Sequence, residues 1–214
     1  MMSELLQEAY YYALEHQAEL AGALLQHVRL VAVALGISIL ICVPLGIWTA
    51  RSRTAATALI NLFNGLRVIP SLAVLFLAIP YFGLSFTSAA LALTLLALPP
   101  VLINTDAAYR TIDQAIRDAA RGMGMTANQI LWRVETPLAL PVIVTGVRTA
   151  ATEVIASATL AAFIGSGGLG LYIVRGFSLF DIPILLVGAI PVALLTLVVE
   201  LLLSGLHRLL EPPH

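Results

Sequence analysis

Residues 118–141 read DAARGMGMTANQILWRVETPLALP and differ in character from most of the chain around them. The stretch carries Asp118, Arg121, Arg133 and Glu135, with two glycines and two prolines, whereas the flanking segments are long, apolar and almost free of charge. Charged and turn-forming residues between two apolar segments predict a structured loop that joins two membrane spans. The organisation of the rest of the chain can be worked out from this loop.

The composition places the chain in the membrane. Of its 214 residues, 60% are hydrophobic and 11% are charged, and the mean hydropathy is +0.98. Soluble domains carry about 25% charged residues. In a bilayer the backbone must satisfy its own hydrogen bonds, so we expect an all-α integral membrane fold. The net charge of −1 gives no sign of a nucleic-acid partner.

Five apolar segments are long enough to cross the hydrocarbon core, which takes about 20 helical residues. They are residues 24–49, 57–80, 84–103, 137–163 and 183–206. We interpret residues 1–214 as a single transmembrane domain. Residues 1–20 hold an N-terminal polar-faced helix, over 3–20, and residues 104–136 form the loop between spans three and four. The sequence leaves open whether residues 165–181 re-enter the membrane or lie on its surface.

Arginine sets the expected orientation, because loops on the cytoplasmic side carry an excess of basic residues. The arginines of the connecting segments lie after span one, between spans three and four, and after span five: Arg51, Arg53, Arg110, Arg117, Arg121, Arg133 and Arg208. The other two loops are neutral, with Arg175 balanced by Asp181. We therefore expect a multi-pass membrane protein with its N-terminus outside and its C-terminus and residues 104–136 in the cytoplasm.

The loop itself has helical character. Small and apolar residues recur at helical spacing up to Gly122 and Gly124, which predicts one helix that ends at these glycines. Thr126 and Gln129 form the pattern T-x-x-Q, which predicts a capped second helix, and Pro137 suits the first turn of the following span. The exposed apolar ridge expected over residues 130–132 has two interpretations, a helix that tucks Trp132 into lipid headgroups or a docking element for a soluble partner.

The same stretch resembles the EAA loop of binding-protein-dependent ABC transporter permeases, whose pattern is E-A-A-x3-G-x9-I-x-L-P. Here Asp118-Ala119-Ala120 is followed after three residues by Gly124, and nine further residues lead to Val134, Glu135, Thr136 and Pro137. Asp118, Val134 and Thr136 depart from the pattern, and Thr136 removes an apolar contact. The resemblance implies a type I ABC importer transmembrane domain of the bacterial cytoplasmic membrane, with about five transmembrane helices and a cytoplasmic coupling loop.

The resemblance also implies partners. The loop would seat on a separate ABC ATPase, present in two copies, which binds ATP and Mg²⁺ and hydrolyses the ATP; this chain would hold no cofactor. An extracytoplasmic substrate-binding protein and a second permease copy or sister permease complete the expected assembly. All eleven basic residues are arginine, so the lysine of a nucleotide-binding P-loop is missing from this chain. The expected coupling residues are Asp118, Ala119, Ala120, Gly122, Gly124, Thr126, Trp132 and Pro137.

Residues 65–83 and 141–176 resemble the osmoprotectant branch of these permeases, with GVRTA and IGSGGLG as the most similar pieces. This branch takes up glycine betaine, choline, carnitine or proline betaine. The alternatives are a permease of a methionine-type or other small-solute importer, or a stand-alone secondary transporter, which would leave the loop unexplained.

Charges inside predicted spans are costly and mark functional positions. Arg67 in span two, and Arg148 and Glu153 in span four, allow a cross-helix pair between Arg67 and Glu153; Glu200 in span five lies nearer the inner face. These charges could form ion pairs of an inner gate or contact the substrate. The pathway or gate candidates are Arg67, Arg148, Glu153, Phe163, Gly165, Gly167 and Gly168.

Two other patterns carry no site. Residues 165–170 fit the dinucleotide fingerprint G-x-G-x-x-G, but they follow a membrane helix, whereas the fingerprint requires a preceding strand. The four histidines are scattered without metal-ligand spacing. With no catalytic grouping in the sequence either, we expect a non-catalytic transport subunit without a metal.

Overall fold

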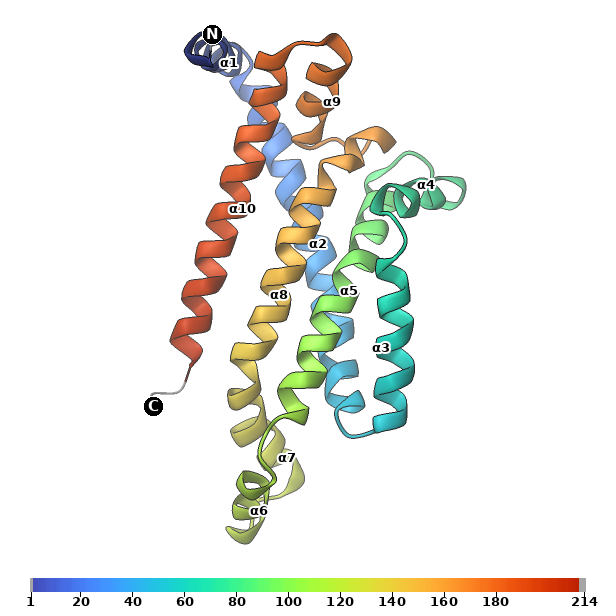
Figure 1. The fold of residues 1–214 in the computed structure, drawn as a ribbon, viewed down its shortest axis with the longest axis vertical. Helices are drawn as coiled ribbons and strands as arrows, with labels where there is room; N and C mark the ends of the chain where they lie inside the picture. Colours follow the sequence, from blue (N-terminus) through green and yellow to red (C-terminus); the bar gives the residue numbers. More distant parts are fainter. Residues whose placement is uncertain (1, 212–214) are drawn as a thin grey trace.

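The structure is a computed structural model, and it describes residues 2–211, which form helices and connecting turns without a strand. Four helices are long and apolar enough to cross a membrane: α2 (Gln17–Thr49), α5 (Phe86–Arg110), α8 (Thr136–Ala158, preceded without a break by shorter helical turns) and α10 (Ile182–Leu210). They lie side by side along the long axis of the molecule (Figure 1). This confirms the all-α membrane fold expected from composition.

The second span, expected as one helix over residues 57–80, is instead a bent pair. Helix α3 (Arg53–Arg67) and helix α4 (Ser71–Phe82) meet at 94°. The last turn of α3 tightens, with Val68 N–H bonded to the Gly65 carbonyl at 3.2 Å. Pro70 then cannot donate a backbone hydrogen bond, and it disfavours a helical conformation for the residue before it. The chain therefore turns aside at residues 68–70.

Helix α5 lies in the middle of the bundle and packs against α2 on one side and α8 on the other. Glycine permits both contacts. A Cβ at Gly46 would lie 2.5 Å from the Thr105 side chain, and a Cβ at Gly146 would lie 2.6 Å from Asn104 Cβ. Small residues let membrane helices approach closely, which is how such helices gain packing energy without a hydrophobic drive. The largest side chains fully buried in this core are Leu30, Leu75, Leu93, Leu102, Ile155 and Ile164.

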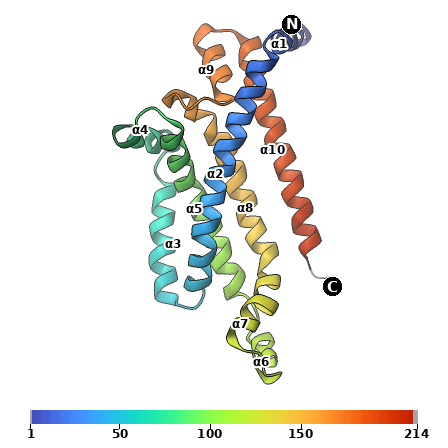
Figure 2. The same ribbon diagram turned by 180° about the vertical axis from the view of Figure 1, so that it is seen from behind.

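The short helices gather at the two ends of the bundle (Figures 1 and 2). Helix α1 (Met2–Glu15), helix α4 and helix α9 (Gly170–Leu179) lie at one end, which we call the α9 end. Helix α6 (Gln114–Gly122) and helix α7 (Ala127–Ile130) protrude at the other. Residues 165–181 thus form a turn and a ten-residue helix too short to span, preceded by a 3-10 helix (Leu160–Ile164).

The expected single helix before Gly122 is in fact two. Helix α5 extends to Arg110, seven residues beyond the expected end of span three, and the chain breaks at residues 111–113. Asp113 then caps α6 by accepting a hydrogen bond from Ala115 N–H at 2.9 Å. Beyond α7, residues Leu131–Glu135 form a π-helical turn that runs directly into α8. This arrangement carries α6 and α7 on the continuation of α8.

Candidate functional site

The tight turn between α6 and α7 is built around Gly124. Its φ of +80° lies in the left-handed region, which L side chains rarely adopt, and its N–H bonds to the Arg121 carbonyl at 2.9 Å. The capping box predicted from sequence is present: Thr126 Oγ1 accepts from Gln129 N–H at 3.4 Å, and Gln129 Oε1 accepts from Thr126 N–H at 2.8 Å. Gly122 lies in the last turn of α6 with open space around it.

One face of α6 presents small and apolar side chains to solvent. Ile116 is 40% exposed and Met123 is 75% exposed, with Ala119 exposed between them at helical spacing. Asp118 is exposed beside this face and pairs with Arg121 at 3.0 Å. Ala120, by contrast, is only 2% exposed. It therefore fills the interior of the α6–α7 element and is not part of the exposed surface that the motif suggested.

The prediction of an exposed apolar ridge over residues 130–132 holds for Trp132 but not for the whole segment. Ile130 is buried at 6% exposure, and only Trp132 projects, at 64% exposure. Pro137 is exposed in the first turn of α8, as the sequence predicted. The exposed apolar side chains of this end therefore come mainly from α6, with Trp132 on the π-turn as the second contributor.

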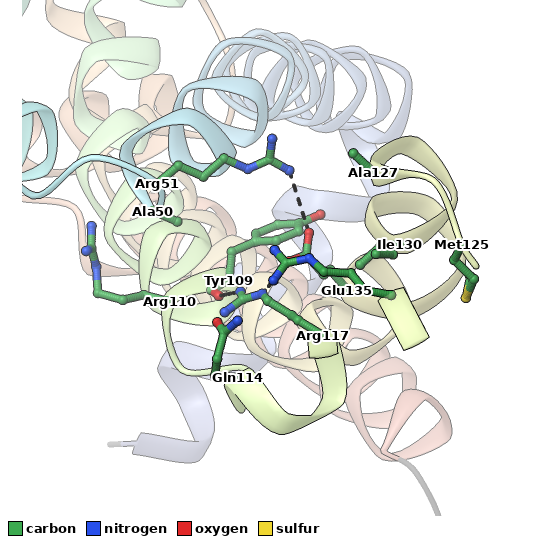
Figure 3. A pocket seen from close by; sticks show the side chains of 11 residues that line it. Ala50, Arg51, Tyr109, Arg110, Gln114, Arg117, Met125, Ala127, Ile130 and Glu135 are labelled. Carbon is green, nitrogen blue, oxygen red and sulfur yellow. Dashed lines mark hydrogen bonds and ion pairs between the residues drawn. The ribbon is translucent and has the colours of Figure 1, made fainter. Parts of the chain in front are cut away.

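A buried ion pair fixes α6 to the rest of the molecule (Figure 3). Arg117 Nε donates to Glu135 Oε1 at 2.6 Å, and its two terminal nitrogens donate to the carbonyls of Tyr109 at 2.6 Å and Ile112 at 3.1 Å. Arg51, after α2, lies 3.6 Å from the other oxygen of Glu135. One guanidinium thus holds the end of α5, the start of α6 and the π-turn together. The cluster lines a cavity of about 470 Å³.

Sequence reasoning did not find this cluster. Arg117 and Glu135 had been counted as loop charges, and their separation of 18 positions matches no helical pairing pattern. Thr136, where the motif expects leucine, is hydrogen-bonded to the Tyr109 hydroxyl at 2.9 Å and to the Leu131 carbonyl at 2.8 Å. The lost apolar contact is therefore replaced by a polar one between α5 and α8. A buried hydroxyl that finds partners carries little penalty.

The charged residues that the sequence singled out inside the spans, Arg67, Arg148, Glu153 and Glu200, form two pairs. Arg67 NH2 lies 2.6 Å from Glu153 Oε1, so the cross-helix pair considered from sequence is present between α3 and α8. Arg148 Nε lies 3.3 Å from Glu200 Oε1, and Arg148 NH1 donates to Ser204 Oγ at 3.1 Å, which links α8 to α10. All four side chains keep about a third or more of their surface exposed. The pairs therefore lie on faces that this chain alone leaves uncovered.

The remaining pathway candidates lie at the α9 end. Phe163 in the 3-10 helix is 51% exposed. Gly165, Gly167 and Gly168 all have positive φ, between 69° and 85°. The fingerprint-like glycines thus form a turn between two helical segments, without the strand that a dinucleotide site requires. The described residues contain no group of three or more histidine, cysteine or acidic side chains able to hold a metal.

Comparison with known families identifies the fold and its role. The model of the family "Binding-protein-dependent transport system inner membrane component" matches residues 42–213. The chain belongs to this family. It is a permease subunit of an ABC importer.

Curated relatives cover most of the chain. It is 40% identical over 210 residues to the osmoprotectant import permease protein OsmW of Salmonella typhimurium, covering 96% of this chain and 98% of that protein. It is 43% identical over 185 residues to the carnitine transport permease protein OpuCB of Listeria monocytogenes, covering 86% and 84%. The choline transport system permease protein OpuBB of Bacillus subtilis is 36% identical, covering 87% and 86%.

Solved structures show the same architecture. A chain of the MetNI methionine ABC transporter, described as inward facing, superposes with a TM-score of 0.77 at 21% identity, covering 92% of this chain and 99% of that one. A chain of an amino acid ABC transporter superposes with a TM-score of 0.72 at 20% identity, covering 92% and 97%. At these identities the likeness concerns the fold, which is that of type I ABC importer membrane domains.

Proposed function

We propose that this permease carries a compatible solute, such as glycine betaine, choline, carnitine or proline betaine, into the cell at the expense of ATP. The names of its relatives support this class of solute, because three of them at 36–43% identity are named for osmoprotectant, carnitine or choline transport. A separate ATPase, in two copies, binds and hydrolyses ATP-Mg²⁺, an extracytoplasmic protein delivers the solute, and a second permease copy or a sister permease completes the pathway. This chain performs no covalent chemistry.

The single observation that carries the coupling role is the shape of the α6–α7 end. A small-residue face on α6, with Ala119 between Ile116 and Met123, protrudes beyond the spans. A soluble partner can approach such a face closely, because alanine keeps the backbone near the surface. The Arg117–Glu135 pair then ties the face to α5 and α8. A push on α6 therefore reaches two spans as a movement of a rigid element.

In this proposal the α6–α7 end lies in the cytoplasm and the α9 end lies outside, with the N-terminus outside as the arginine distribution predicts. ATP binding draws the two ATPases together and turns the permeases outward, so that solute arrives from the binding protein. Hydrolysis restores the inward-facing state. Coupling requires that the ATPase and the solute each bind the two states with different affinities.

The test is ATP-driven uptake of radiolabelled glycine betaine into proteoliposomes that hold this permease with its ATPase and binding protein. We expect uptake by the wild-type complex. We also expect uptake to be lost in Ala119→Arg, because a long cation fills the space that the ATPase surface needs. The control is Leu209→Arg, which adds the same cation at a position that is 84% exposed near the end of α10.

Three results would contradict the proposal in different ways. Normal uptake by Ala119→Arg would show that the exposed face of α6 is not the contact with the ATPase. Uptake of methionine but not of glycine betaine, choline, carnitine or proline betaine would keep the coupling scheme and replace the solute. Uptake that persists without ATPase and ATP would identify a secondary transporter.

A further inference from the structure

A second cavity, of about 330 Å³, lies at the α9 end, between the first turns of α2 and the glycine turn that precedes α9. Its lining comes from two segments that are far apart in the sequence and lie at the same end of the molecule (Figure 1). The lining side chains that bear on its chemistry are Glu19, Gln26, Leu171, Tyr172 and Arg175. The cavity is separate from the coupling end and from the two ion pairs inside the spans.

Two opposite charges line this cavity without neutralising each other. Glu19 comes from the first turn of α2 and Arg175 from α9, and both line the cavity together with Tyr172. Within residues 2–211, neither has an oppositely charged side chain within 4.0 Å. Asp181, which the sequence suggested as the balance for Arg175, instead accepts a hydrogen bond from Ile184 N–H at 3.0 Å and caps α10.

The wall between these charges suits a methylated cation. Tyr172 is 6% exposed and meets Tyr12 edge-on at 6.5 Å, so its ring is held in place, and Leu171 adds apolar surface. Burial, and then the Glu19 carboxylate, raise the pKa of Tyr172 above its usual value near 10, so the phenol is neutral at physiological pH. A quaternary ammonium has no N–H to donate and is bound by aromatic faces and carboxylates.

The opposite wall of the cavity is formed by the backbone of Gly167 and Gly168, which have no side chains. Gly167 and Gly168 have φ of +79° and +85°, and a Cβ at either would lie 3.3 Å from Gln26 or His27. Gln26 donates to the Ser166 carbonyl at 3.1 Å and fixes the turn against α2. Behind Gly168, the fully buried His27 has its Nδ1 without a hydrogen-bond partner among the described residues. The absence of side chains at Gly167 and Gly168 therefore keeps the cavity open beside the unpaired Nδ1 of His27.

We propose that this cavity is a binding subsite for a zwitterion that carries a quaternary ammonium and a carboxylate. Arg175 binds the carboxylate, while Glu19 and the face of Tyr172 bind the ammonium. The inference rests on the proposed function and narrows it, because it selects betaines and carnitine over choline, which lacks the carboxylate. The subsite would receive solute at the end of the permease where the binding protein delivers it.

The experiment is ligand-observed saturation-transfer NMR on the permease–ATPase complex in nanodiscs, without binding protein. The probes are glycine betaine, choline and 3,3-dimethylbutanoate, which keeps the shape and the carboxylate of glycine betaine but has carbon in place of the charged nitrogen. We expect glycine betaine to bind about tenfold more tightly than either analogue, since each analogue loses one charged contact. We expect Arg175→Gln and Glu19→Gln to remove that preference, with Glu15→Gln as the matched control.

The outcomes separate the subsite from the transport function. Wild-type binding in both variants, or equal binding of all three probes, would overturn the subsite. The proposed function would still stand if the complex took up glycine betaine with ATP. If Arg175→Gln and Glu19→Gln bound the probes normally but no longer recruited the binding protein, the two charges would be contacts with that protein and the subsite would be excluded. Loss of probe binding in nanodiscs rich in phosphatidylethanolamine would assign the cavity to a lipid headgroup. Selective binding combined with uptake of an unrelated solute would retain the subsite and overturn the function.

Discussion

Glu135 is the residue on which the geometry of the α6–α7 end depends. Its side chain is 9% exposed and lies between Arg117 at 2.6 Å and Arg51 at 3.6 Å. Arg117 also donates, through its two terminal nitrogens, to two backbone carbonyls at the α5–α6 break. If the carboxylate is lost, a mostly buried guanidinium is left without a counter-charge, which is more costly than losing the pair as a whole.

We expect Glu135→Gln to destabilise the folded protein by about 3 kcal/mol and to reduce ATP-driven uptake, since α6 loses its anchor. Thermal unfolding of the purified permease in detergent, followed by fluorescence, measures the first effect. Glu211→Gln is the control, because Glu211 is exposed and lies 3.8 Å from a histidine near the end of α10. An unfolding curve like that of the wild type would show that Arg117 holds α6 through the backbone carbonyls alone.

The Arg67–Glu153 pair allows a test by exchange of charges. Both side chains are partly exposed on a face of the spans. An unpaired charge on that face is unfavourable whether lipid or a second permease covers it. We expect Arg67→Glu to lower the amount of folded protein in the membrane and to lower uptake. The double variant Arg67→Glu with Glu153→Arg should restore much of both. Failure of the double variant to recover either quantity would mean that each side chain has its own partner elsewhere in the assembly.

At the scale of the elements, proline and glycine decide the geometry more than hydropathy does. The apolar run over residues 57–80 predicted a span, and its length is right, but its direction changes by 94° at residues 68–70. Pro70 was visible in the sequence, yet a proline inside a span is often tolerated as a mild kink. Only the packing of α4 across the end of α5 shows that the chain turns aside here.

Gly146 provides a test of helix packing. A Cβ there would lie 2.6 Å from Asn104 Cβ and 2.8 Å from the Pro100 carbonyl oxygen, and backbone cannot move aside as a flexible side chain can. We expect Gly146→Val to destabilise the fold by roughly 2 kcal/mol or more, as overpacking does. Gly36→Val on α2 is the control, since no atom lies within 4 Å of its Cβ position. Equal melting temperatures for the two variants would contradict the close α5–α8 contact.

The coupling segment shows what local sequence can and cannot predict. The Thr126 capping box and the turn at Gly124 depend on neighbouring residues, and both were predicted. The break at residues 111–113 was not, because the apolar spacing continues through it and only Asp113, as a capping residue, marks the new start. The burial of Ile130 and Ala120 was not predicted either, since it depends on how α6 and α7 fold onto each other.

For the whole molecule, the number of spans and the arrangement of the ends follow from the sequence. The five apolar segments correspond to four long helices and the bent pair. The long-range contacts do not follow, because nothing local relates Arg117 to Glu135 or Arg148 to Glu200. These pairs arise only when helices distant in sequence lie side by side.

The orientation of the whole molecule can be measured with single cysteines. Cys42 is fully buried, so the natural chain should react poorly with a maleimide that cannot cross membranes. In intact cells stripped of any outer barrier, we expect Ala18→Cys to be labelled from outside and Met123→Cys to be labelled only after the membrane is opened. The reverse pattern would place the α6–α7 end outside and exclude contact with a cytoplasmic ATPase.

The π-turn over residues 131–135 has a further consequence for how this molecule transmits force. Each residue of an α-helix advances the chain by about 100° around the axis, so a turn that takes in one more residue changes the bearing of everything beyond it. The direction of the exposed α6 face is therefore set in part by the extra residue in the π-turn that joins α7 to α8. Helix α8 itself packs on α5 beyond this turn. Deleting one residue within 131–135 should close the π-turn and swing α7 and α6 around the axis of α8. The direction in which α6 presents its exposed face therefore depends on the number of residues in this single turn as well as on the side chains of α6.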